Sequence, residues 1–359
     1  MRSMINTLEL LRSLSEADGI SGHEEGVRSL IQQAMAPLAD DARADALGNL
    51  IALKRGAGPE PRRAIMLAAH MDEIGLMVSG LEGAFLRFAP VGGVDLRTLV
   101  GQEVTVHGTR KLPGIIASRP PHVLTAEERS QAVPLERLYI DTGLGIDSLQ
   151  ECVRVGDLVT MRRTFTSLNG EYATGKAMDD RAGVVSLVLC LQALKQIQHQ
   201  WDVYAVATTQ EEIGLRGATV SAYGLAPDLG IAVDVGFGRQ QGVSDPAIIE
   251  MDGGPAVALG PNVHPAMRAR MMATAKDQEI KVQTEVVPGA TGTDGWALQV
   301  AREGIPTLVL SIPLRYMHTT VETICLRDIE RTGRILARFI AGLDGAAAAE
   351  LGLEQGASA

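Results

Sequence analysis

The stretch AIMLAAHMD, residues 64–72, sets a run of apolar residues directly before a histidine and an aspartate. A short apolar run of this kind is typical of a buried strand. Side chains two positions apart on a strand point to the same face, so His70 and Asp72 are expected to lie together. An imidazole beside a carboxylate suits a metal ligand held by its partner. A surface histidine and aspartate at the end of a strand would give the same pattern.

Three further apolar runs lead to acidic residues or a histidine in the same way. These are DVYAVATT at 202–209 before Glu211 and Glu212, LGIAVDV at 229–235 with Asp234, and PTLVLSI at 306–312 before His318. In open α/β sheets the carboxyl ends of the strands form the ligand crevice. We therefore expect these side chains to meet there, although they are far apart in the sequence.

Each of these motifs also has an ordinary structural explanation. Asp179 and Asp180 open a helix expected at 179–199, where acidic residues stabilise the helix dipole. The pair Glu211 and Glu212 fits an exposed loop, and an aspartate such as Asp234 is common in turns. The set is more specific than its members, because all of them fall where one crevice would lie.

The chemistry of this set favours a pair of metal ions. Two histidines and several carboxylates suit hard to borderline divalent cations. Two such cations about 3.5–4 Å apart need a bridging carboxylate. We therefore expect one aspartate to contact both cations.

The order of predicted elements indicates an α/β fold. From residue 175 onward, strands alternate with helices expected at about 262–277, 293–303 and 326–343, with a further strand at 281–287. Such alternation predicts a mixed sheet flanked by helices. Residues 75–165 instead contain short β-like runs separated by Gly and Pro, which predicts a smaller inserted β-barrel-like domain.

The predicted boundaries follow from these patterns. The catalytic domain is expected at 1–74 and 166–345, the inserted β-rich domain at 75–165, and a flexible tail at 346–359. Near the N-terminus, apolar residues at helical spacing predict a first helix. Ser21 followed by Glu24 predicts a capping box that opens a second helix, with His23 exposed in the cap.

Composition excludes several function classes. The formal net charge of −10 disfavours nucleic acid and anionic membranes as partners. Aromatic residues make up only 3% of the chain, which argues against stacking platforms for sugars or single strands. Three widely spaced cysteines, and the absence of a signal peptide or membrane-spanning run, predict a cytoplasmic protein.

Six ordered motifs resemble the tetrahedral aminopeptidase family, which includes glutamyl and leucyl aminopeptidases of bacteria and archaea. They are AAHMDEIGLMV, GKAMDDRAG, TTQEEIGLRGA, VDVGFG, GTDGWALQ and IPLRYMHTTVE. The resemblance extends over nearly the whole chain, including PPHVLTAEER in the inserted domain. GTDG and YMHTT depart from the GTDA and YMHS-Pro common in such enzymes, without removing a ligand position.

The resemblance implies a role for each candidate residue. It implies Zn²⁺ or Co²⁺ as two cations per subunit, and dodecamers built from dimers through the inserted domain. Short peptides are the implied substrates. The implied roles are His70 and Asp234 as ligands of one metal, Glu212 and His318 as ligands of the other, Asp179 as the bridge, Asp72 as the carboxylate behind His70, and Glu211 as the general base.

Three other functions compete with this prediction. An endoglucanase-type glycoside hydrolase needs two carboxylates around a sugar and normally no metal ligands, so the histidines and the low aromatic content argue against it. A related dimetal deacylase or carboxypeptidase would use a similar core. A non-catalytic protein that kept the fold is disfavoured by the complete set of ligand positions and by Glu211.

Overall fold

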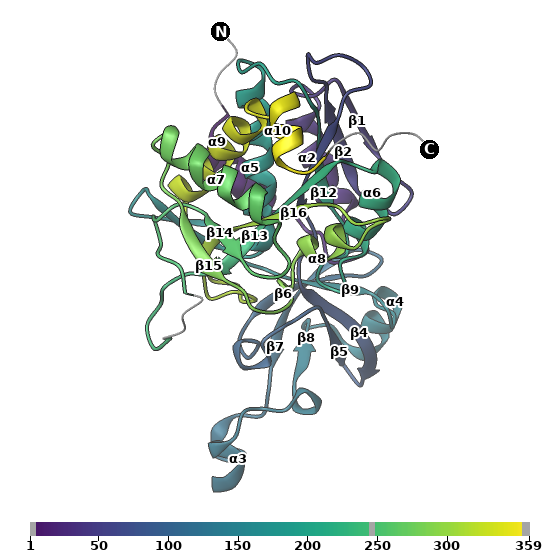
Figure 1. Ribbon diagram of the computed structural model, residues 1–359. Helices are drawn as coiled ribbons and strands as arrows, with labels where there is room; N and C mark the ends of the chain where they lie inside the picture. Colours follow the sequence, from purple (N-terminus) through teal and green to yellow (C-terminus); the bar gives the residue numbers. More distant parts are fainter. Residues whose placement is uncertain (1–4, 244–247, 354–359) are drawn as a thin grey trace.

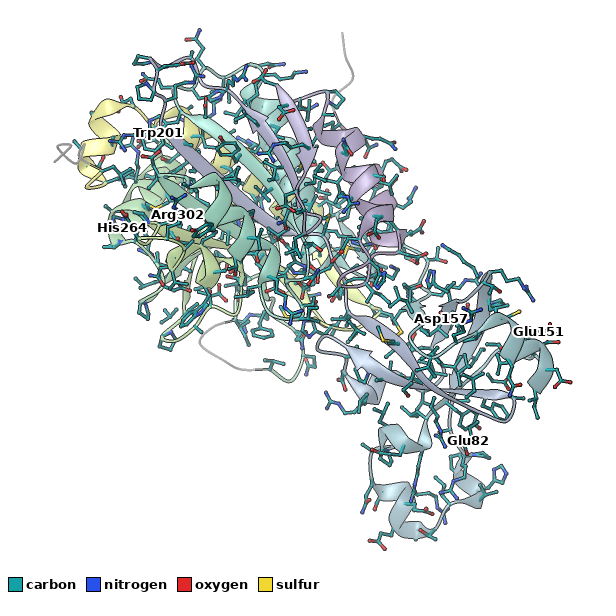
Figure 2. All side chains as sticks on the ribbon, turned by 90° about the vertical axis from the view of Figure 1, so that its right-hand side faces the viewer. Glu82, Glu151, Asp157, Trp201, His264 and Arg302 are labelled. Carbon is teal, nitrogen blue, oxygen red and sulfur yellow. The ribbon has the colours of Figure 1, made fainter. Side chains whose placement is uncertain are left out.

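The computed structural model describes residues 5–243 and 248–353. A large mixed sheet with helices on both faces forms one part, and a closed β-barrel forms the other (Figure 1). Figure 2 shows the barrel, which carries Glu82, Glu151 and Asp157, projecting from the end of the core opposite Trp201. The predicted fold class is therefore confirmed.

Four parallel strands form the centre of the sheet, in the order β12, β3, β13, β16. Their bounds are Ala64–His70 for β3, Asp202–Thr208 for β12, Leu229–Phe237 for β13 and Thr307–Arg315 for β16. Most of their residues are buried, because helices cover both faces of the sheet. This burial explains why these strands appear in the sequence as nearly continuous apolar runs.

Shorter strands extend the sheet on both sides of this centre, mostly in antiparallel pairs. They are β1 (Asp41–Ala44), β2 (Leu50–Lys54), β10 (Thr166–Leu168), β11 (Tyr172–Gly175), β14 (Ala256–Leu259), β15 (Gln283–Val286) and β17 (Glu322–Cys325). Strand β15 is held to the sheet through β14, which pairs with β16.

Helices on the first face of the sheet pack around α5, and those on the second face around α8. The first group is α1 (Thr7–Glu16), α2 (Glu25–Met35), α5 (Met178–Leu194), α7 (Pro265–Asp277) and α9 (Leu326–Ala341); the second is α6 (Arg216–Leu225) and α8 (Asp294–Gln299). Helices α5 and α9 approach closely at Gly333, where an added Cβ would lie 2.9 Å from the carbonyl oxygen of Ser186. Within the described residues, no helix is long and apolar enough to cross a membrane.

The barrel closes in the order β4, β5, β8, β7, β6, β9 around its own apolar core, which includes Leu76, Val104 and Ile140. Its strands are β4 (Gly75–Glu82), β5 (Phe85–Val91), β6 (Glu103–His107), β7 (Lys111–Ala117), β8 (Tyr139–Asp141) and β9 (Leu158–Met161). Helix α4 (Ile146–Cys152) and the short helix η1 (Leu96–Thr98) complete it. Residues 118–138 form an arm that extends away from the barrel (Figure 1) and contains η2 (Pro121–Val123), α3 (Ala126–Ser130) and η3 (Leu135–Arg137).

Two local predictions near the ends of the chain are wrong. Helix α2 begins with Glu24 at its cap and no side-chain cap bond, whereas the Ser21 hydroxyl donates to Asp72 Oδ2 at 2.5 Å. The predicted tail instead forms helix α10 (Gly345–Glu350), capped by Asp344 and packed through Ala347. Burial of its small apolar side chains offsets the entropy of ordering this segment. Residues 354–359 of the predicted tail lie outside the described residues.

Candidate dimetal active site

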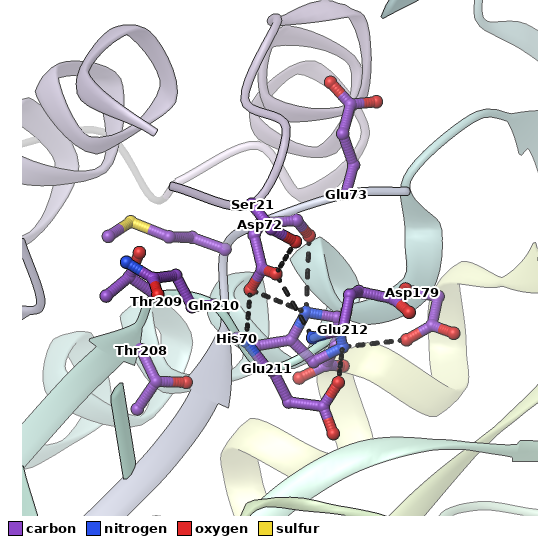
Figure 3. Close-up of polar contacts among 12 residues, drawn as sticks. Ser21, His70, Asp72, Glu73, Asp179, Thr208, Thr209, Gln210, Glu211 and Glu212 are labelled. Carbon is purple, nitrogen blue, oxygen red and sulfur yellow. Dashed lines mark hydrogen bonds and ion pairs between the residues drawn. The ribbon is translucent and has the colours of Figure 1, made fainter. Parts of the chain in front are cut away.

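The ends of the central strands bring the predicted site residues together, and Figure 3 shows His70, Asp179 and the two glutamates of this group. His70 is the last residue of β3, Asp234 lies within β13, and His318 follows β16. Glu211 and Glu212 lie just beyond β12, and Asp179 is the second residue of α5. Strand register explains the convergence, because Thr208 is paired with His70.

Asp179 lies between the two histidines. Its Oδ1 is 2.9 Å from His70 Nε2, and its Oδ2 is 3.3 Å from His318 Nε2. Each carboxylate oxygen therefore faces a different imidazole. This is the arrangement that a carboxylate shared by two cations requires.

The remaining acidic groups divide between the two histidines. His70 Nε2 lies 3.9 Å from Asp234 Oδ1 and 4.0 Å from Glu211 Oε2. His318 Nε2 lies 3.6 Å from Glu212 Oε2. The geometry thus pairs His70 with Asp234 and His318 with Glu212, on either side of Asp179.

Asp180 is the second acid of its pair and is fully buried. Its Oδ1 accepts the backbone N–H of Gly183 at 3.0 Å, which ties it to the first turn of α5. Its ligand atoms also fall within 4.8 Å of those of His70 and Asp234. Asp180 therefore lies behind the site, with one oxygen engaged by the backbone.

Burial and the neighbouring charges shift the pKa values of these groups. Desolvation is the main cause that raises the pKa of Glu212 to about 8, and nearby carboxylates add to it. Desolvation also raises the pKa of Glu211 to about 8. The hydrogen bond to Asp179 raises the pKa of His318 to about 9. Buried carboxylates at this density are costly unless cations compensate them. The donor set, two imidazoles among carboxylates, fits a pair of divalent cations.

Asp72 supports the site from behind His70. Its Oδ1 accepts the backbone N–H of Glu211 at 3.0 Å, and its Oδ2 accepts that of Glu212 at 3.2 Å. The same Oδ2 accepts the Ser21 hydroxyl, and Oδ1 lies 3.6 Å from His70 Nδ1. Asp72 therefore holds an imidazole and both glutamate backbones (Figure 3). The part played by Ser21 was missed, because its local pattern also fits a capping box.

Glu322 is a further supporting residue that sequence reasoning missed. It is buried at the start of β17, where its Oε2 accepts the backbone N–H of Met178 at 2.8 Å and that of Asp179 at 3.3 Å. Its Oε1 accepts the backbone N–H of His318 at 2.9 Å. One carboxylate thus fixes the backbone on both sides of the site. Its position four residues after His318 is the sequence feature that could have indicated this supporting role.

Two other buried acids hold the last residue of β12 and the segment that follows it. Glu24 Oε1 accepts the N–H of Gln210 at 3.2 Å, and Asp294 Oδ2 accepts the Thr208 hydroxyl at 2.5 Å. Burial raises the pKa of Asp294 to about 6. Asp294 belongs to the GTDG motif, whose position in the sequence gave no indication of this contact.

A third acidic group, formed by Asp252, Cys325 and Asp328, also has metal-ligand spacing. Arg327 and Arg331 donate to Asp252, and the backbone of Gly254 donates to Asp328. Because arginines and backbone N–H groups already occupy these oxygens, this cluster is a structural ion-pair network.

The candidate site opens into a cavity of about 650 Å³. Its walls include the site residues His70, Asp179, Glu211, Glu212, Asp234 and His318. Further along, the cavity is lined by β13, β15 and β16. A ligand in this cavity would therefore contact the acidic centre directly.

Comparison with known proteins gives a consistent result. Residues 48–335 match the M42 glutamyl aminopeptidase family. The lysyl aminopeptidase of Pyrococcus furiosus is 38% identical over 334 residues, covering 90% of this chain and 94% of that protein. The TET aminopeptidase of a marine-sediment Thaumarchaeota archaeon superposes with a TM-score of 0.91 at 32% identity, covering 96% and 98% of the two chains. The TET1 peptidase of Pyrococcus horikoshii, which can assemble into a tetrahedron or a large octahedral shell, has a TM-score of 0.82 at 32% identity, covering 94% and 100%.

The fold and these relationships define a metal-dependent peptidase that acts on peptide N-termini. The chain belongs to the M42 glutamyl aminopeptidase family, whose members are dimetal enzymes. The predicted family and activity are confirmed.

Proposed function

We propose that this aminopeptidase binds two zinc or cobalt ions and removes N-terminal residues from short peptides. His70 and Asp234 would hold one cation, Glu212 and His318 the other, and Asp179 both. The observation that carries the assignment is the placement of the two Asp179 oxygens, at 2.9 Å and 3.3 Å from different histidines. Imidazole and carboxylate donors together suit these metals.

Glu211 is the proposed general base. When bound, the two cations would supply Lewis acidity and lower the pKa of the nucleophilic water. Glu211 Oε2, beside His70, would take a proton from the attacking water. Glu211 then returns the proton to the leaving amine. Its backbone is held by Asp72, which fixes the carboxylate relative to the imidazole of His70.

The density of acidic groups supports action at a free N-terminus. A peptide α-amino group is cationic below a pKa of about 8, so it is attracted to the buried carboxylates that line the cavity. A blocked amine loses that attraction. Selectivity for exopeptidase cleavage follows from the charge of the site.

The test is hydrolysis of leucine p-nitroanilide before and after metal exchange. A strong chelator should abolish turnover, and Zn²⁺ or Co²⁺ should restore it, whereas the N-acetylated substrate should stay intact throughout. Turnover of the blocked substrate would instead favour a deacylase. Turnover that survives verified metal removal would exclude the proposed metal chemistry.

We also propose that the chain assembles into dodecamers built from dimers. The similarity to a TET1 peptidase whose solved structure is a dodecamer, at 31% identity, supports this assembly. The inserted barrel and its arm, residues 118–138, extend from the core and present surface for a dimer contact (Figure 1). Light scattering coupled to size-exclusion chromatography measures the mass directly, and a monomer at working concentrations would contradict the proposal.

A further inference from the structure

The cavity beside the site contains a buried carboxyl that the proposed chemistry does not use. Glu285 lies on β15, lines the cavity, and is only 8% exposed. Its Oε2 accepts the Ser311 hydroxyl at 2.5 Å. Ser311 is the register partner of Asp234, so this contact places Glu285 within one strand of the proposed metal ligands.

Gly236 on β13 lies close to this carboxyl. Because residues two apart on a strand face the same side, Gly236 lies on the same face of β13 as Asp234. A Cβ added to Gly236 would lie 2.8 Å from the Ser311 Cβ and 3.4 Å from Glu285 Oε1. The missing side chain therefore lets β13 pack closely against Ser311 and Glu285, two residues along the strand from the proposed ligand Asp234.

The cavity wall around Glu285 is partly apolar. Phe237, Val286 and Val287 line the same cavity, and apolar walls suit the methylene stem of a lysine or arginine. The cavity thus combines apolar walls with a carboxyl that lies apart from the proposed metal ligands.

Among the described residues, no cationic side chain pairs with Glu285. Burial raises the pKa of Glu285, and in the described part of the chain the Ser311 hydroxyl is the one group found to lower it. A desolvated carboxylate is costly without a cation beside it. A cationic substrate side chain would supply that partner.

We propose that Glu285 selects peptides with lysine or arginine at the N-terminus, its carboxylate receiving the cationic head while the α-amino group and scissile bond lie at the metal site. This inference rests on the proposed function. An acidic N-terminal side chain is disfavoured at the same place by like-charge repulsion. Glu285 is thus a specificity-determining residue, outside the metal ligands and the general base.

The test compares kcat/KM for lysyl, arginyl, leucyl and glutamyl p-nitroanilides in the metal-loaded enzyme and in Glu285→Gln. A charge-assisted contact corresponds to roughly a 10- to 100-fold preference. Glu285→Gln should therefore lower kcat/KM for the two basic substrates by about that factor, leave the leucyl substrate close to wild type, and raise the glutamyl substrate. An unchanged ratio of lysyl to leucyl kcat/KM would overturn the proposal.

A control variant separates this result from loss of fold or of the enzyme itself. Glu303→Gln makes the same charge change at an exposed position and should leave the ratio unchanged. A wild-type enzyme that hydrolyses leucyl but not basic substrates refutes this inference alone, whereas no hydrolysis of any substrate after metal loading refutes the proposed function.

Discussion

The carboxylate of Asp72 accepts the backbone N–H of Glu211 at 3.0 Å, across two neighbouring parallel strands. Asp72 is fully buried, and it also contacts Ser21 and the ring of His70. The position of the proposed base is therefore coupled to that of a proposed metal ligand. This coupling predicts that Asp72 acts on turnover without touching the substrate.

Asp72→Asn should lower both metal affinity and kcat, each by roughly 10- to 100-fold. The amide replaces one acceptor oxygen by a donor, so the side chain can no longer accept the backbone N–H groups of both Glu211 and Glu212. Metal titration and steady-state kinetics on the same preparation measure both effects. Ser21→Ala, which removes only one donor to Asp72, should have a smaller effect. Wild-type values in Asp72→Asn would show that the contact has no functional role.

Glu211→Gln and Glu212→Gln should separate catalysis from metal binding. Loss of a general base costs about 10²–10⁴-fold in rate, so Glu211→Gln should lose turnover while it keeps both metals. Glu212 lies 3.6 Å from His318, and its substitution should lower metal occupancy. Metal content from elemental analysis, measured together with kcat, distinguishes the two variants. Normal turnover in Glu211→Gln would remove it as the base.

A buried ion-pair network next to the site predicts that loss of its anion, Glu73, destabilises the fold more than loss of one of its cations, Lys176. Lys176 Nζ lies 2.6 Å from Glu73 Oε2, and Arg181 lies 3.3 Å from Glu73 Oε1. Glu73→Gln leaves two buried cations without their anion, at a cost of about 3–5 kcal/mol. Lys176→Met should cost less, because Glu73 keeps Arg181. Chemical denaturation gives both free energies of unfolding, and the reverse order would contradict this account.

Asp294 predicts a pH-dependent stability difference. Burial raises its folded-state pKa to about 6, above the value of about 3.9 expected in the unfolded chain. The ionised form therefore disfavours folding, and stability falls as pH rises from about 4 through 6. Asp294→Asn removes this penalty, so its stability relative to wild type should rise by on the order of 2–3 kcal/mol between about pH 4 and pH 8. Denaturation of the metal-depleted proteins measures it, since bound cations would lower this pKa; a difference independent of pH would be the contrary result.

The central strands and their acidic ends were predictable because burial on both faces leaves a strong local signature. The apolar run before His70 forms β3, and the run expected at 202–209 forms β12. The helix expected at 293–303 is shorter, since α8 ends at Gln299. The spacing of apolar residues predicts which face of a helix is buried. It does not predict where the helix ends because its packing partners end.

The supporting residues of the site were not predictable in the same way. Ser21 reaches Asp72 across 51 positions of sequence, and Glu322 reaches Asp179 across 143. Such contacts depend on how distant segments pack. In the case of Ser21, a local capping pattern competed with the long-range contact and gave the wrong prediction. Helix α10 was missed for a related reason, because its alanines are stabilised by the core they contact.

The most direct test of the central claim is anomalous diffraction from crystals of the zinc-loaded enzyme, with metal content measured on the same sample. The account predicts two metal ions per chain, one between His70 and Asp234 and one between Glu212 and His318, with an oxygen of Asp179 bound to each. A single ion, or two ions that do not share Asp179, would contradict it.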